Sequence, residues 1–87
     1  MNIILGILYN EYMKQEYREN YIRLGLNIAY YRKLNGLTQE QLADRINVDY
    51  SHISKMELAT VGISLDKLFD IANALGIPPY KLLQFKD

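Results

Sequence analysis

The sequence predicts an all-α domain of five helices, preceded by an additional N-terminal helical segment. Apolar residues recur at the i, i+4, i+7 spacing of one helical face, as in Leu24, Ile28 and Tyr31. Residues that cap helices stand at the ends of these periodic stretches, and no stretch alternates in the manner of a β-strand domain. The 87 residues suffice for one modest hydrophobic core and are too few for two.

Residues 1–20 are apolar and rich in tyrosine. Ile4, Leu8 and Tyr12 follow the spacing of one helical face, which predicts a helix from about Ile7 to Arg18. The short apolar run at the very start would by itself also fit a strand. We expect this extension either to cover the core of its own domain or to pack on a partner subunit.

The domain proper, residues 21–87, begins with a predicted helix from about Tyr21 to Leu34, with Asn20 as its N-cap. Gly36 can take the left-handed conformation that commonly ends a helix. Thr38 and Gln41 then have the spacing of a capping box, in which each side chain bonds the other residue's backbone amide. A new helix is therefore expected to start directly after the threonine.

This second helix should run from Gln39 to Ile46 and be followed by a sharp turn at Asn47, a residue type that tolerates positive φ. Val48 anchors the turn in the core, and Asp49 caps a third helix from Tyr50 to about Leu58. The expected buried residues of the two helices are Leu42, Ala43, Ile46, Ile53 and Met56.

Two further helices are predicted in the last third of the chain. Ser64 caps the fourth, Leu65 to Leu75, and Gly76 ends it. Pro79 suits the first turn of a fifth helix, about Pro79 to Gln84. The expected buried residues are Leu65, Leu68, Ile71, Ala72, Leu75, Leu82 and Leu83.

The stretch from Thr38 to Glu57 meets the requirements of a helix-turn-helix. Ala43 is small where the second helix must cross the first, and Asn47 follows four positions later to make the turn. Ile53 and Met56 pack the second helix against the domain. Its opposite face is then exposed in the geometry by which a recognition helix enters the major groove. That face carries Tyr50, Ser51, Ser54 and Lys55.

Composition excludes several classes of function. The chain has no cysteine and a single histidine, His52, which rules out disulfides and most metal or triad chemistry. We therefore expect neither an enzyme nor a cofactor. No apolar run is long enough to span a bilayer, so a cytoplasmic protein without a membrane partner is expected. Net charge is zero, with two basic and three acidic side chains in residues 1–20, so DNA binding would depend on a local basic face.

From about Leu24 to Leu83 the chain resembles the lambda-repressor, Cro and Xre family of bacterial and phage DNA-binding domains. The resemblance rests on an ordered series of short matches. These are Tyr31-Arg32-Lys33, Gly36-Leu37-Thr38-Gln39, Glu40-Gln41-Leu42-Ala43, Ile53-Ser54-Lys55-Met56-Glu57 and the Ala-Leu-Gly-Ile that follows Leu68 to Asn73. The resemblance implies a five-helix, lambda-repressor-like domain that binds double-stranded operator DNA as a homodimer.

The resemblance also implies roles for individual residues. Gln39 matches a glutamine that contacts phosphate, Tyr50 and Ser51 match base-contacting positions, and Lys55 matches one that reaches base edges or phosphate. Arg32 and Glu57 match a structural ion pair between the first and third helices.

Where the family commonly has a basic residue, a glycine and another basic residue, this chain has Leu58, Ala59 and Thr60. Losing these cations should weaken backbone binding. The available positive groups are Arg23, Lys33, Arg45 and Lys55, of which Lys55 is the best placed.

The leading hypothesis is a sequence-specific, dimeric transcriptional regulator, either a repressor or an operon controller, that reads a short inverted repeat. The alternative is a protein-interaction module on the same fold, antitoxin-like or regulator-binding, with weak DNA affinity. Zero net charge, the uncharged Leu58 to Thr60 and the apolar N-terminal extension support this alternative.

Overall fold

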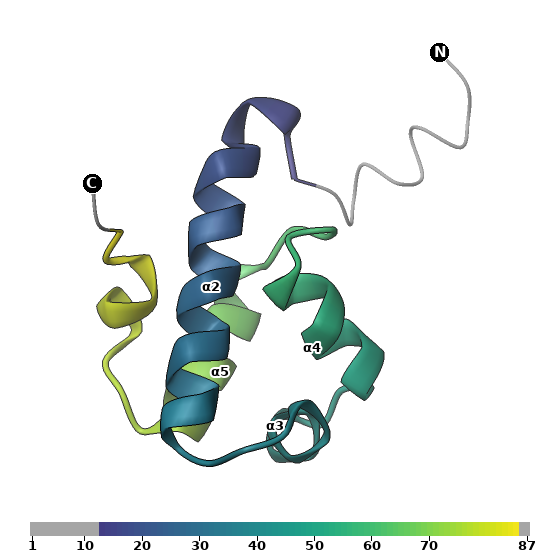
Figure 1. The fold of residues 1–87 in the computed structure, drawn as a ribbon, viewed down its shortest axis with the longest axis vertical. Coiled ribbons are helices and arrows are strands. Elements are labelled where there is room, and N and C mark those ends of the chain that lie inside the picture. The colour runs from purple at the N-terminus through teal and green to yellow at the C-terminus, as the bar shows by residue number, and fades with distance from the viewer. Residues whose placement is uncertain (1–12, 86–87) are drawn as a thin grey trace.

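The protein is all-helical throughout the part described by the computed structural model, residues 13–85 (Figure 1). That part contains four α-helices and two 3-10 helices and no strand. In chain order the elements are η1 (Gln15–Tyr17), α2 (Arg18–Leu34), α3 (Gln39–Ile46), α4 (Tyr50–Glu57), α5 (Leu65–Leu75) and η2 (Pro79–Leu83).

The long helix α2 forms the centre of the molecule. In Figure 1, α3 and α4 lie to one side of it and η2 lies to the other. α2 packs on α4, α5 and η2, while α3 packs on α4 and α5. The core between them is a single cluster whose largest fully buried members are Ile28, Leu42, Ile53, Met56, Ile71 and Leu82.

The predicted caps of α3, α4 and α5 are confirmed. The backbone amide of Gln41 donates to Thr38 Oγ1 at 3.0 Å, and the amide of Thr38 donates to Gln41 Oε1 at 2.8 Å. Asn47 has a φ of 58°, in the left-handed region that the sharp turn between α3 and α4 requires. Asp49 accepts from the amide of Ser51, and Ser64 accepts from the amide of Lys67. These local bonds determine where each helix begins.

The start of α2 differs from the prediction. The helix begins at Arg18 and continues from η1, so Asn20 lies inside it and caps nothing. A tertiary contact explains the earlier start: Arg18 Nη1 donates to the carbonyl oxygen of Ala59 at 2.7 Å, which ties the first turn to the loop after α4. Of the helix predicted over 7–18, residues 7–12 lie outside the described part. In the remainder, Gln15–Tyr17 form the 3-10 helix η1 and Arg18 is the first residue of α2.

The predicted fifth α-helix is also wrong in type, because residues 79–83 form the 3-10 helix η2. Two prolines at its start remove amide donors, and the remaining backbone bonds join residues three apart, Lys81 to Pro78 and Gln84 to Lys81. Asn27 Nδ2 donates to the carbonyl oxygens of Leu82 and Gln84, so a side chain of α2 supplies the bonds that another helical turn would have made.

Two residues predicted to be buried are exposed. Leu65 is 66% exposed and Leu83 is 48% exposed, while their neighbours Leu68 and Leu82 are buried as expected. Leu65 is the first residue of α5 and Leu83 the last of η2, and both lie at the edge of the core rather than under another element. No helix within residues 13–85 has the length and hydropathy needed to cross a bilayer.

Candidate nucleic-acid interface

α4 is held against the domain along one side and presents the other to solvent. Ile53 and Met56 are completely buried beneath it, and Ala43 on α3 is 1% exposed. Together with the turn at Asn47, these contacts fix the angle between the two helices. The helix-turn-helix predicted from the spacing of these residues is confirmed.

The outward side of α4 carries four of the five predicted site residues. Tyr50 is 52% exposed and Lys55 is exposed, whereas Ser51 and Ser54 are half-buried. Eight residues of α-helix span about 12 Å, which is about the width of the major groove of B-DNA. The exposed side of α4 is therefore small enough to enter that groove. The contact of these side chains with DNA stays a prediction. His52, between them in sequence, is half-buried.

Hydrogen bonds to Asp49 use both donors of Ser51, its backbone amide and its hydroxyl. Both donate to Asp49 Oδ2. These bonds hold the pKa of the Asp49 carboxyl below its usual range. With the hydroxyl hydrogen used in this way, the free lone pairs of Ser51 remain, which suits them to accept from an exocyclic amine of cytosine or adenine.

The predicted ion pair between Arg32 and Glu57 is confirmed as a structural feature. Arg32 Nε donates to Glu57 Oε2 at 2.6 Å and Arg32 Nη2 donates to Glu57 Oε1 at 3.0 Å. Arg32 Nη1 also donates to the carbonyl oxygen of Leu37, so one guanidinium joins α2, α4 and the segment directly before α3.

Gln39, the fifth predicted site residue, belongs to the same network. Its Nε2 donates to Glu57 Oε1 at 3.0 Å, which places it beside the C-terminal end of α4, at the other end from Tyr50. One amide hydrogen remains for a phosphate. The bond to Glu57 was not foreseen, because residues 18 positions apart give no local signal of a side-chain contact.

The loop after α4 explains part of the departure from the family pattern. Ala59 has a φ of 57°, the left-handed region in which a glycine is favoured, and it is fully buried. Leu58 is 66% exposed where a basic residue is common, and Thr60 Oγ1 donates to the carbonyl oxygen of Lys55. The glycine of the family series was the signal that could have predicted this backbone geometry.

Among the cations named from the sequence, Lys55 is the one on α4. Arg45 Nη1 donates to the carbonyl oxygen of Ala74 on α5, and Arg23 lines a groove between α2 and η2. Lys33 is exposed in the last turn of α2.

Solved structures of other proteins share this architecture. The restriction-modification controller protein C.AhdI from Aeromonas hydrophila matches with a TM-score of 0.72 and 30% identity, over 74% of this chain and 97% of that one. The hypothetical transcription factor NHTF from Neisseria matches with a TM-score of 0.73 and 30% identity, over 76% of each chain.

Sequence comparison points the same way. Control protein C.BamHI from Bacillus amyloliquefaciens is 37% identical over 51 residues, which make up 59% of this chain and 63% of that protein. The curated relatives are matched over less than two thirds of their own length.

The helix-turn-helix family model HTH_3 matches residues 28–82, which is more than half of the chain. The match begins within α2 and ends within η2, so it takes in α3, α4 and α5 completely. The resemblance stated from the sequence is thereby confirmed, and the chain belongs to the HTH_3 helix-turn-helix family.

Proposed function

We propose that the protein is a sequence-specific DNA-binding transcriptional regulator, a repressor or an operon controller, that acts as a homodimer on a short inverted repeat. One observation carries the proposal: α4 is anchored through the completely buried Ile53 and Met56, and it presents Tyr50 and Lys55 to solvent. A helix held rigidly on one face and polar on the other is the arrangement that reads base edges in the major groove.

Binding-site selection from random duplexes tests this proposal directly. The full-length protein should enrich two copies of one short motif in inverted orientation, separated by about one helical turn of DNA. Selection should be run at low salt, where attraction to phosphates is strongest, because Leu58 and Thr60 replace cations that would neutralise phosphates. Failure to enrich any motif under these conditions would reject sequence-specific DNA binding.

Lys55→Ala should weaken binding to the selected duplex about tenfold, because each subunit loses a charge-assisted contact to the DNA. If Lys55 contacts a phosphate, the slope of log affinity against log salt should become shallower by about one unit per subunit. Gel shift or fluorescence anisotropy across a salt series measures both quantities.

Lys67→Ala is the matched control for this substitution. Lys67 lies on α5, where its Nζ is 3.8 Å from Asp70 Oδ2, and its removal changes net charge equally. Equal losses of affinity in the two variants would mean that Lys55 acts only through overall charge.

The proposed homodimer would bury an apolar hollow of about 400 Å³. Leu65 and Leu83 line this hollow and are the two residues whose exposure contradicted the sequence prediction. Tyr17, Tyr21 and Phe85 also line it, so η1, α2, α5 and the end of the described chain meet there. Burying such surface between two copies is a common solution for a small domain.

Leu65→Glu should shift the protein from dimer to monomer, because a carboxylate would enter an apolar contact in each subunit. Loss of one buried leucine on each side corresponds to a weakening on the order of a hundredfold or more. Sedimentation velocity measures the change. Leu26→Glu is the control, since Leu26 is equally exposed and does not line the hollow. A native chain that sediments as a monomer at high micromolar concentration would contradict the dimer.

A protein-interaction module with weak DNA affinity is the second candidate, favoured by the exposed Leu58 at a position where the family commonly has a cation. In that case any DNA signal should be indifferent to Lys55→Ala, and the protein should copurify with a defined partner. The salt series above distinguishes the two candidates.

A further inference from the structure

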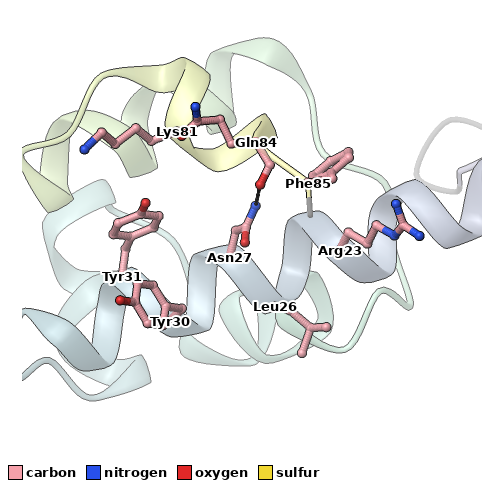
Figure 2. A pocket seen from close by; sticks show the side chains of 8 residues that line it. All are labelled: Arg23, Leu26, Asn27, Tyr30, Tyr31, Lys81, Gln84 and Phe85. Carbon is pink, nitrogen blue, oxygen red and sulfur yellow. Dashed lines mark hydrogen bonds between the residues drawn. The ribbon is translucent and has the colours of Figure 1, made fainter. Parts of the chain in front are cut away.

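A groove of about 820 Å³ lies between α2 and η2 (Figure 2). Its walls include Arg23, Leu26, Tyr30 and Tyr31 from α2, and Lys81 and Phe85 from the C-terminal segment. None of these residues takes part in the helix-turn-helix, so the proposed DNA contacts leave the groove unexplained.

The two walls of the groove are joined at a fixed distance. Asn27 Nδ2 donates to the carbonyl oxygens of Leu82 at 2.9 Å and Gln84 at 3.1 Å, which ties the last segment to α2. Figure 2 shows the bond to Gln84. Tyr30 and Tyr31 pack edge to face, with ring centroids 5.0 Å apart. A ligand therefore meets a preformed surface, and less conformational entropy is lost when it binds.

The side of α2 at this groove is apolar and uncovered within the described residues. Leu26 and Tyr30 line the groove, and Leu34 continues their i, i+4, i+8 series along α2 beyond it. Their exposed fractions are 62%, 59% and 67%. Large side chains repeated at this spacing form a stripe along one helix. Contiguous exposed apolar surface is typical of an interaction site.

The two charged side chains that line the groove are both basic. Arg23 and Lys81 lie toward opposite ends of the groove in Figure 2, and neither forms a salt bridge within residues 13–85. From Asn20 to Leu34 and from Gly76 to Phe85 the sequence contains no acidic residue. An apolar groove with an unpaired cation toward each end is complementary to a segment that is apolar in the middle and acidic at its ends.

The groove is separated from the candidate DNA-reading helix by α2 itself. In Figure 1, η2 and α4 lie on opposite sides of α2. A straight duplex in contact with α4 would therefore not reach Lys81. Lys81, which belongs to η2, therefore lies outside the surface that α4 presents.

We propose that the groove between α2 and η2 binds an acidic, amphipathic helical segment of another protein. Its apolar residues pack on Leu26, Tyr30 and Phe85, and its carboxylates lie near Arg23 and Lys81. The groove is only partly enclosed, which suits a segment of chain better than a small molecule that must be enclosed. This mode of recognition is that of a helix laid into an apolar groove.

A displayed library of helices tests the proposal without knowledge of the natural partner. Helices of about 16 residues, with randomised positions on one face, are displayed on yeast and sorted with the labelled full-length protein. Enriched clones should combine apolar residues at i, i+4 spacing with acidic residues toward both ends. Their binding should weaken roughly fivefold or more when the labelled protein carries Arg23→Glu or Lys81→Glu.

Lys67→Glu is the matched control, because it makes the same change of net charge on α5, outside the groove. Circular dichroism melts confirm that the three variants remain folded. The assay contains no DNA, so its outcome is independent of the proposed regulator function.

Several results would overturn the proposal. The first is a sort without enrichment, which is the result expected if another segment of the same chain occupies the groove. The second is enrichment of clones without an acidic bias. The third is a set of clones that lose as much affinity with Lys67→Glu as with Lys81→Glu. Loss of duplex binding by Lys81→Glu equal to that of Lys55→Ala would assign the groove to DNA. A shift from dimer to monomer in Lys81→Glu would assign it to a second copy of this chain.

Discussion

Arg32→Ala is expected to lower the free energy of unfolding by roughly 3–5 kcal/mol, because it leaves a buried carboxylate without its cationic partner. The side chains of Arg32 and Glu57 are only 9% and 7% exposed. Gln39 would then remain as the hydrogen-bond donor that the structure places on Glu57. A loss of this size corresponds to a melting temperature lower by at least about 12 °C. Thermal and urea unfolding measure it.

The matched comparison is a double variant, Arg32→Met with Glu57→Leu, which removes both charges and keeps apolar volume. It should be clearly more stable than Arg32→Ala, because no unpaired charge is left in the interior. Arg45→Ala removes an exposed arginine and should cost less than about 1 kcal/mol. A changed DNA footprint together with a nearly unchanged melting temperature in Arg32→Ala would reject the structural assignment of the pair.

Gly25→Ala should destabilise the domain by about 3 kcal/mol, at the upper end of the usual cost of overpacking. A β-carbon at this position would lie 2.5 Å from the carbonyl oxygen of Glu57 and 2.7 Å from that of Met56. Both are backbone atoms at the end of α4, so no side-chain rotation can relieve the overlap. α2 and α4 would have to move apart, and the ion pair of Glu57 would be disturbed as well.

Gly36→Ala is the comparison that separates the cost of steric overlap at Gly25 from the cost of placing alanine in a left-handed conformation. Gly36 has a φ of 71° and nothing within 4 Å of an added β-carbon, so only the left-handed conformation penalises alanine, by about 1–2 kcal/mol. In an open helical position, alanine would instead be favoured over glycine by about 1 kcal/mol. Urea unfolding that shows Gly25→Ala to be as stable as the native chain would contradict the close crossing of α2 and α4.

Several local features could be predicted from the sequence because they depend on residues four or fewer positions apart. Thr38 and Gln41 cap each other, and Asn47 turns the chain between two helices. Gly76, with a φ of 68°, ends α5 where expected. The ordered family series added the pairing of Arg32 with Glu57, which no local rule would have supplied.

The errors lie where distant segments decide the outcome. α2 starts earlier than predicted because Arg18 reaches the carbonyl of Ala59. The segment after Pro78 stays 3-10 because Asn27 bonds its carbonyls from another helix. The proposed site residues Gln39, Tyr50, Ser51, Ser54 and Lys55 stay predictions for the DNA experiments.

The sequence by itself determined the helical class, the helix-turn-helix and the residues of α4 that face outward, because periodicity and capping are short-range properties of the chain. Only the tertiary structure decided which apolar side chains are left uncovered. α2 carries large apolar residues on more than one face. The spacing of Leu24, Ile28 and Tyr31 indicated the face that meets the core, but the sequence could not say whether another element also covers Leu26. The answer depends on where α4, α5 and η2 pack, and that packing leaves Leu26, Tyr30 and Leu65 at the surface.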